Sequence, residues 1–358
     1  MATWKFHKKP SWPSYGWRRT DIAPSPTPKQ NNWKRILPGL IISLVALIIL
    51  LLLAEPRKLL EALRMADYRL VLVGIGTMSV WLVVRSVFWR TLLQEKATFS
   101  QVFFSINEGY LLNNVLPFRL GEIGRALILS YKANLSFLFV FSTILIERAF
   151  DVGISASLLL ISVPFVVGAS WAGQAALISG VVVLFGLGML YLVARNRDRL
   201  LVWYESLSQR WTILQKIGSH HIAAFLSGLE VLTDGKRFLK AVLWGSLNWG
   251  IALVQYYIFM LAFFPEGKFL WATFALGVVA LGVAAPSSPG ALGVYELAVV
   301  GSLALFGADP AVALAYALTT HLTQYLITTI LGSIGLFRDG LTLTGVYQRA
   351  RATPLDQP

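Results

Sequence analysis

Two long apolar stretches of this chain are interrupted by proline and glycine in nearly the same way, about half the chain apart. Both interruptions contain the pattern Pro-x-x-Leu-Gly, with a glutamate one or three residues later. The interrupting residues are Pro117 and Gly121 in the first stretch, and Pro286, Pro289, Gly290 and Gly293 in the second. A helix that breaks at membrane depth leaves backbone N–H and C=O groups unpaired, which is tolerated only where protein or a hydrated cavity satisfies them. Two such breaks in corresponding halves of a membrane protein indicate a transport site.

The composition indicates a protein that crosses a membrane several times. Of 358 residues, 56% are hydrophobic and 14% are charged, whereas about a quarter of the residues in a soluble domain are charged. The absence of cysteine excludes disulfides and thiolate metal sites, and the four histidines are too scattered for a histidine-only metal site. We therefore expect no metal and no cofactor. The net charge of +13 is typical of cytoplasmic loops that face anionic headgroups, and we expect no nucleic-acid partner.

Hydropathy divides the chain into one transmembrane domain, residues 36–337, between two polar tails. The tails are residues 1–35 and 338–358, the two half-repeats are about 36–194 and 206–337, and the basic cytoplasmic loop that joins them is 195–240. The first tail is rich in Pro and Trp and is interpreted as disordered or lying on the headgroups. The predicted fold is all-α, with about six full spans and two re-entrant hairpins made of broken helices.

The apolar runs give the predicted boundaries of these spans. The six full spans are Ile36–Ala54, Leu70–Leu93, Phe137–Val167, Gln174–Ala194, Ala241–Phe264 and Pro310–Phe337. The broken stretches are Phe99–Ser130 and Phe269–Phe306, and the segment between Glu55 and Arg69 is interpreted as an outside loop.

Lysine and arginine set the predicted orientation, because cytoplasmic loops carry an excess of both. Both tails and the loop at 195–240 are basic, which places the two termini in the cytoplasm, for a multi-pass protein of the bacterial cytoplasmic membrane. The hairpin at Pro117 then enters from the cytoplasm and the hairpin at Pro289 from outside, which is an inverted repeat. A similar offset separates Leu70 from Ala241, at the starts of the preceding spans. The alternative is that the Pro289 segment makes two ordinary crossings around a Pro/Gly loop.

Arg119, Glu122 and Arg125 recur every three residues and so share one face of a predicted helix. This face carries one surplus positive charge, and a helix that starts after Pro117 would direct free N–H groups at the same place. An anionic phosphate is the expected guest. The alternative is a self-neutralised structural pair with one arginine that reaches the interface.

A second group of charges falls in the span Phe137–Val167. Glu147 and Asp151 are four residues apart and share a face, and Arg148 is expected to pair with Asp151. The candidate partners of Glu147 are Arg85, Arg119 and Arg125. These charges are interpreted as either a structural cluster or a functional relay. Arg85 and Arg90 lie toward the end of their span and are expected to extend to the interface.

The second half contains its own ionisable groups. Glu296 has no basic neighbour in sequence, so it must be protonated, hydrated or paired with a distant cation. His321 falls at the position that the repeat places opposite it, on a helix with a polar stripe. In the first hairpin, Asn107 and Asn114 lie seven residues apart on one face, where they are expected to bind headgroups or satisfy the broken backbone.

These motifs carry a resemblance to a known family. They are Asn114 to Pro117, Gly121-Glu122-x-x-Arg125, Glu147-Arg148-x-x-Asp151, Pro289-Gly290-x-x-Gly293-x-x-Glu296, and a late helix with His321 and Gly332. In these motifs the chain resembles the N-terminal transmembrane region of lysylphosphatidylglycerol synthetases and its stand-alone UPF0104 and YbhN-like relatives, over about Ile36–Phe337. The resemblance implies a lipid flippase. In the synthetases an aminoacyl-transfer domain follows, whereas this sequence ends at Pro358, so we expect transport and no synthesis.

The expected function is a flippase-like transporter of a membrane phospholipid or other phosphate-bearing lipid, with a separate lipid-modifying enzyme as a candidate partner and the oligomeric state left open. Arg119, Arg125 and Arg148 are expected to hold the phosphate. The groups expected to gate the site or handle protons are Glu122, Glu147, Glu296 and His321. The alternatives are a membrane scaffold, a lipid transferase, and an intramembrane hydrolase that pairs Ser287 or Ser288 with His321.

Overall fold

The computed structural model describes residue 48 and residues 55–116, 120–167, 172–209, 219–283 and 289–341. All regular elements in these ranges are helices, as the sequence predicts for an all-α protein. Several predictions fall outside the described residues: the N-terminal tail, nearly all of the span Ile36–Ala54, most of the C-terminal tail, and Pro117, Arg119, Pro286, Ser287 and Ser288.

The helix boundaries follow the predicted spans closely. The elements are α2 Pro56–Met65, α3 Tyr68–Leu92, α4 Phe99–Val115, α5 Leu120–Ala133, α6 Phe137–Val167, α7 Ala172–Arg195, α8 Arg197–Ser208, α10 Ser219–Leu229, η1 Glu230–Leu232, α11 Gly235–Phe263, α12 Phe269–Gly282, η2 Pro289–Ala291, α13 Val294–Ala304 and α14 Pro310–Arg338. One prediction was wrong: the segment between Glu55 and Arg69 is not a loop, because it contains α2. Pro56 starts this helix, where the missing proline N–H costs no hydrogen bond.

Three of the described helices are long and apolar enough to cross a membrane, namely α3, α6 and α11. Large apolar side chains on their outer surfaces are exposed, including Leu72 on α3, Phe165 on α6 and Leu243 on α11. Such a surface suits lipid, where exposed apolar groups cost nothing. The protein is therefore an all-helical membrane protein, and six as the number of spans stays a prediction.

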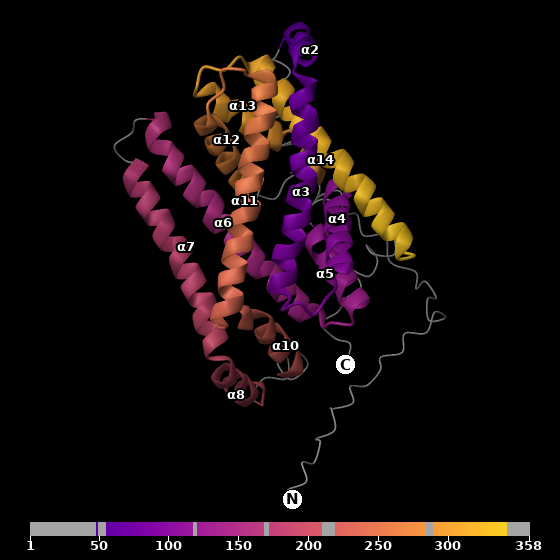
Figure 1. Cartoon of the computed structure of the whole chain (residues 1–358). Coiled ribbons are helices and arrows are strands. Elements are labelled where there is room, and N and C mark those ends of the chain that lie inside the picture. The colour runs from indigo at the N-terminus through magenta and orange to yellow at the C-terminus, as the bar shows by residue number, and fades with distance from the viewer. Residues whose placement is uncertain are drawn as a thin grey trace, which may run out of the picture.

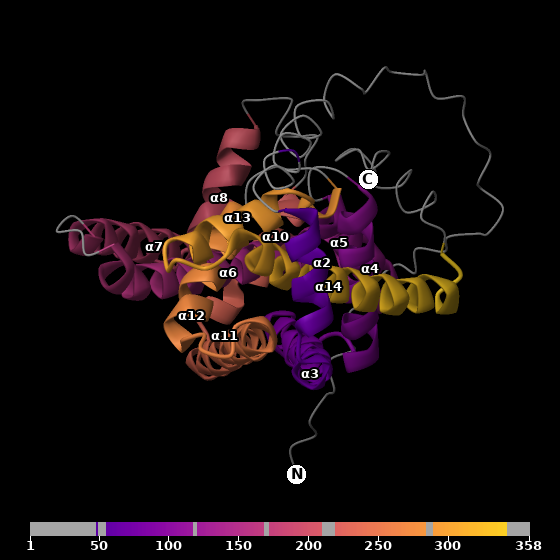
Figure 2. The ribbon, with the colours of Figure 1, turned by 90° about the horizontal axis from the view of Figure 1, so that it is seen from above.

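Helices α3 and α11 run nearly parallel to each other, and α6, α7 and α14 are inclined to them (Figure 1). Helices α2, α12 and α13 lie toward one end of this bundle, whereas α8 and α10 lie at the other end (Figure 1). Helices α4 and α5 lie on the α10 side of the midpoint. Seen along the bundle, α7 and the α4–α5 pair lie on opposite flanks, as Figure 2 shows.

Two large apolar cores, and a smaller cluster that joins Leu111 of α4 to Leu336 of α14, hold the described helices together. One core, toward α2, includes Val71 of α3, Phe259 of α11 and Tyr316 of α14. The other core, toward α10, includes Phe88 of α3 and Ile144 of α6. Helices α3, α6 and α11 extend from one core into the other. Their middle turns therefore lie between the cores, and these turns carry the polar side chains of the site.

Candidate functional site

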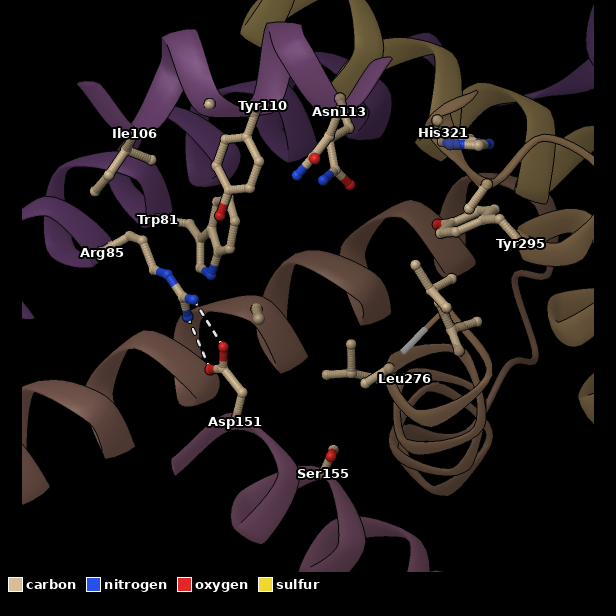
Figure 3. A pocket seen from close by; sticks show the side chains of 18 of the residues that line it. Trp81, Arg85, Ile106, Tyr110, Asn113, Asp151, Ser155, Leu276, Tyr295 and His321 are labelled. Atoms are coloured by element: carbon tan, nitrogen blue, oxygen red, sulfur yellow. Dashed lines mark hydrogen bonds and ion pairs between the residues drawn. The ribbon is translucent and has the colours of Figure 1, made fainter. Parts of the chain in front are cut away.

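A cavity of about 300 Å³ lies between the two cores and receives side chains from both halves of the chain. Its walls come from α3, α4, α5, α6, α11, α12, α13 and α14 and from η2. Figure 3 shows Trp81, Arg85 and Asp151 on one side of it, and Tyr295 and His321 on the other. A cavity of this kind, with convergent polar groups at the middle of long apolar helices, is the usual setting of a ligand site.

The charged side of the cavity is built around an arginine from α3. Both terminal nitrogens of Arg85 bind Asp151 of α6, at 2.8 Å to Oδ1 and 2.7 Å to Oδ2. Arg85 also pairs with Glu147, and Trp249 Nε1 of α11 donates to Asp151 Oδ1 at 3.1 Å. The expectation that Arg85 extends to the interface was therefore wrong, because two carboxylates of α6 neutralise it inside the protein.

Glu147 is completely buried and is held by two arginines. Arg85 pairs with Oε1 of this carboxylate, and Arg125 of α5 binds the other oxygen, with NH2 2.9 Å from Oε2. The guanidinium of Arg125 also lies over the Trp89 ring, 4.6 Å from its centroid. Two of the three predicted candidate partners of Glu147 are thus its partners, and the third, Arg119, lies outside the described residues.

Arg148 differs from the other two arginines because its contacts are long and its side chain is open. It lies 3.5 Å from Glu122, 3.4 Å from Glu147 and 3.4 Å from Asp151. Its side chain is 30% exposed, against 4% for Arg85 and Arg125. The expected pair of Arg148 with Asp151 is present, but Arg85 makes the closer contact.

The charges in the described part of this cluster balance, with three arginines and three carboxylates. Because Arg119 lies outside the described residues, the surplus positive charge predicted for the face of Arg119, Glu122 and Arg125 stays a prediction. Helix α6 brings two carboxylates of its own against α5 and α3, which a count along one helix face does not include.

The other side of the cavity is formed by α13 and α14. His321 Nδ1 lies 2.6 Å from Glu296 Oε1, and the second oxygen of this carboxylate accepts a hydrogen bond from Gly293 N at 2.7 Å. The ring of Tyr295 stacks on His321 with centroids 4.2 Å apart. Glu296 thus has a hydrogen-bonding partner inside the protein, and this partner is the histidine that the repeat placed opposite it.

The backbone at the two interruptions is satisfied by polar side chains, as helix breaks inside a membrane require. Gly121 N donates to Asn113 Oδ1 at 2.8 Å, and Tyr325 OH donates to the backbone oxygen of Asn114. Asn114 Nδ2 also lies 3.2 Å from the hydroxyl of Thr328 on α14. At the second interruption Gly290 and Gly293 have φ of 64° and 82°, which glycine adopts at little cost. The side chain of Asn113 thus satisfies broken backbone, whereas the side chain of Asn114 binds threonine hydroxyls, so both predicted roles of Asn114 stay predictions.

Sequence reasoning missed the wall that α11 contributes to the cavity. Asn248, Trp249, Gln255 and Tyr256 all line it. The signal was present in the sequence, because Asn248 and Gln255 lie seven residues apart inside an apolar span and therefore on one helix face. Trp81, one turn before Arg85, also lines the cavity and was missed. In the described ranges, no group of three or more His, Asp or Glu side chains is arranged to hold a metal ion.

The fold and site together define a class: an integral membrane protein of packed helices with a polar, ion-paired cavity at the middle of the bundle. Residues 36–332 match the family described as the lysylphosphatidylglycerol synthase TM region, and the chain belongs to this family. The resemblance inferred from the motifs is therefore confirmed.

Three curated relatives are similar to most of this chain. AglD of Haloferax volcanii, named a glycosyltransferase, is 25% identical over an alignment of 335 residues, and the match covers 84% of this chain and 53% of AglD. A UPF0104 membrane protein of Methanothermobacter thermautotrophicus is 22% identical over 304 residues, 82% of this chain and 90% of the relative. A UPF0104 membrane protein of Methanocaldococcus jannaschii is 24% identical over 277 residues, 72% of this chain and 80% of the relative. This chain spans about half the length of AglD. No solved structure matches it.

Proposed function

We propose that this protein moves a phosphate-bearing lipid across the membrane, in the manner of a flippase. The observation that carries the proposal is the cavity between the two cores, which joins both helix interruptions to a buried ion network. Ionisable groups at this depth are expensive and usually mark a substrate path. The headgroup would occupy the cavity while the acyl chains stay in lipid.

In this proposal Arg148 contacts the phosphate, because among the three arginines Arg85, Arg125 and Arg148 it has the longest ion-pair contacts and the most exposed side chain. Arg85 and Arg125 hold Glu147 and Asp151 in place, so these two carboxylates keep an arginine partner when Arg148 turns to a phosphate oxygen. Glu122 would gate the site by releasing Arg148. Membership of the lysylphosphatidylglycerol synthase family supports a role with lipids.

The proposed topology is an inverted repeat in the bacterial cytoplasmic membrane, with both termini in the cytoplasm. Helices α4 and α5 would form one re-entrant hairpin and α12 and α13 the other, entering from opposite faces. The positions of these pairs toward opposite ends of the bundle support this arrangement (Figure 1). Asn114 and His321, on α4 and α14, would then face the lipid path from the two halves.

A second candidate function is a glycosyl-transfer step at the membrane. AglD is named a glycosyltransferase and its similarity covers 84% of this chain, which favours this candidate over the scaffold and hydrolase alternatives. Sugar release or transfer by the purified protein, with no lipid movement, would support it.

Lipid movement in liposomes tests the leading proposal. Full-length protein is reconstituted with acyl-labelled fluorescent phospholipids, and the fraction bleached by external dithionite is recorded over time. We expect wild type and the control Lys236→Gln, an exposed residue near the start of α11, to raise this fraction above that of empty vesicles. Arg148→Gln and Glu122→Gln should lower it. Equal curves for wild type and empty vesicles across several lipid classes would overturn the proposal.

A further inference from the structure

Five residues in the wall of the cavity have a polar side-chain group without a hydrogen bond to the described part of the chain. The buried atoms Trp81 Nε1, Arg85 Nε, Arg148 Nε and Asn248 Oδ1 are four of these groups. The fifth is the amide of Gln255, which is only 7% exposed. All five residues line the cavity. Because buried polar groups are almost always satisfied, this set points to a ligand that supplies their partners.

The unpartnered atoms include both donors and an acceptor. The indole N–H of Trp81 and the Nε–H of Arg85 donate, whereas Asn248 Oδ1 accepts. A phosphate offers acceptors only and leaves the oxygen of Asn248 unsatisfied. A hydroxyl group donates and accepts, so a ligand with hydroxyls beside its phosphate can satisfy both kinds of atom.

On the other side of the cavity, the imidazole of His321 also has an atom that is unpartnered within the described ranges. The neighbouring hydroxyls of Tyr256, Tyr295 and Thr320 already bind one another, at 3.0 Å from each to the next, and Thr320 also donates to a backbone oxygen. His321 is fixed through Nδ1 to Glu296, and its Nε2 hydrogen-bonds to none of the described residues. The cavity-lining imidazole therefore presents one open nitrogen, which can bind a hydroxyl in either tautomer.

The open acceptors are neutral, which argues against an ammonium group in the ligand. Every carboxylate that lines the cavity already has an arginine partner, Glu122 with Arg148 and Asp151 with Arg85. An ammonium held only by neutral groups would be a costly buried charge, whereas amide groups suit a neutral hydroxyl.

Aromatic side chains on both sides of the cavity suit a saturated ring that presents a C–H face. Trp81 stacks with Tyr110, with ring centroids 6.2 Å apart, on one side. Tyr295 and Tyr325 lie on the other side. Aromatic rings provide a large, rigid apolar surface, on which the C–H face of a sugar or cyclitol can pack while its hydroxyls reach the amides.

We propose that the lipid headgroup is a sugar or cyclitol phosphate, with its ring hydroxyls read by Asn248, Gln255 and His321 and its phosphate near Arg148. This inference rests on the proposed function, because it names the headgroup of the lipid in the same cavity. A site built to bind a hydroxyl discriminates strongly against an analogue that lacks it.

Binding to the purified full-length chain in detergent tests the headgroup. The probes are acyl-labelled phosphatidylinositol, phosphatidylglycerol, phosphatidic acid and phosphatidylethanolamine, with free inositol 1-phosphate as competitor. We expect phosphatidylinositol to bind at least about tenfold more tightly than phosphatidic acid and phosphatidylethanolamine, as two or three added hydrogen bonds imply. Asn248→Leu and Gln255→Leu should reduce this preference and leave the affinity for phosphatidic acid unchanged. The control is Ser246→Leu, at an exposed position on the same helix, which should keep the preference for phosphatidylinositol.

Equal affinity of the wild type for all four lipids overturns the headgroup assignment. This comparison uses only the wild-type protein, so it tests the assignment even if a variant fails to fold. Free inositol 1-phosphate that competes as strongly as the lipid overturns a lipid ligand. Lipid movement without headgroup preference overturns only this inference. A ring preference in binding without any lipid movement overturns the transporter function and leaves the site in place.

Discussion

His321 and Glu296 lie 25 residues apart in sequence and are hydrogen-bonded at 2.6 Å, and the same carboxylate accepts from Gly293 N at 2.7 Å. One side chain therefore joins α14 to the first turn of α13 directly after the second interruption. Glu147 has the corresponding role in the first half, where it joins α6 to Arg85 on α3 and Arg125 on α5. In each half, a buried glutamate fixes the helices around the cavity.

Glu296→Ala should destabilise the protein more than Glu296→Gln. Alanine removes the acceptor for Gly293 N and the partner of His321. Both groups would then be buried without a hydrogen bond, which costs about 1–3 kcal/mol for each group. Glutamine keeps one acceptor oxygen and should cost less. Thermal unfolding in detergent, followed by tryptophan fluorescence, measures the difference. Equal melting temperatures for the two variants would contradict the bridging role of the carboxylate.

The three arginines of the ion network should differ in their effect on stability. Arg125→Gln and Arg85→Gln each remove a partner from the buried Glu147, and we expect a loss of about 3–5 kcal/mol. Arg148→Gln should cost about 1 kcal/mol or less, because its contacts are long and partly solvated. Fluorescence-detected size exclusion after heating ranks the variants, with Lys236→Gln as the charge-matched control. An Arg148 variant as unstable as the Arg125 variant would make Arg148 structural and remove it as the phosphate ligand.

Glycine 332 should not tolerate alanine. A Cβ on Gly332 would lie 2.6 Å from the backbone oxygen of Asn107, so α14 would have to move away from α4. We expect a loss of about 1–3 kcal/mol from this overpacking. Gly301→Ala is the matched control, because its Cβ meets nothing within 4 Å, and it should be neutral or slightly stabilising. If both variants unfold at the wild-type temperature, the close approach of α4 and α14 is wrong.

Single cysteines test the proposed topology without a background reaction, since the sequence contains no cysteine. We expect a membrane-impermeant maleimide to label Glu95→Cys and Tyr131→Cys from the cytoplasm, and Glu266→Cys and Leu305→Cys from outside. All four positions are exposed. Labelling of the first pair and the second pair from the same face would exclude an inverted repeat.

A fifth cysteine separates a re-entrant hairpin from two full crossings. Leu292, just before α13, is exposed. In a re-entrant hairpin Leu292→Cys stays within the membrane and should react with the maleimide slowly from the cytoplasm. In two ordinary crossings it would lie in a cytoplasmic loop and react as fast as Glu95→Cys.

Local pattern was sufficient to place most helices. The predicted span Phe137–Val167 has the same limits as α6, and the predicted Pro310–Phe337 ends one residue before α14 does. These limits depend on hydropathy and on proline and glycine, which act over a few neighbouring residues. The mixed charges between Glu55 and Arg69 hid α2 because a short amphipathic helix and a polar loop have similar composition.

Sequence reasoning also selected several residues that the structure brings into one cavity, including Glu122, Arg148, Asp151 and His321. It could not assign their partners. Arg85 binds a carboxylate 66 residues away. The wall formed by Asn248 and Gln255 comes from the part of α11 after Lys240, which contains no charged residue.

By itself, then, the sequence determined that the chain is helical, that it belongs in a membrane, where its helices break, and which charges lie at depth. Only the tertiary structure decided that the charges of the described network balance, that Arg148 is the open arginine, and that Glu296 is bridged to His321. The reason is physical: hydropathy and backbone preference are local properties, whereas a buried charge is stabilised by whichever opposite charge helix packing brings within a few ångströms.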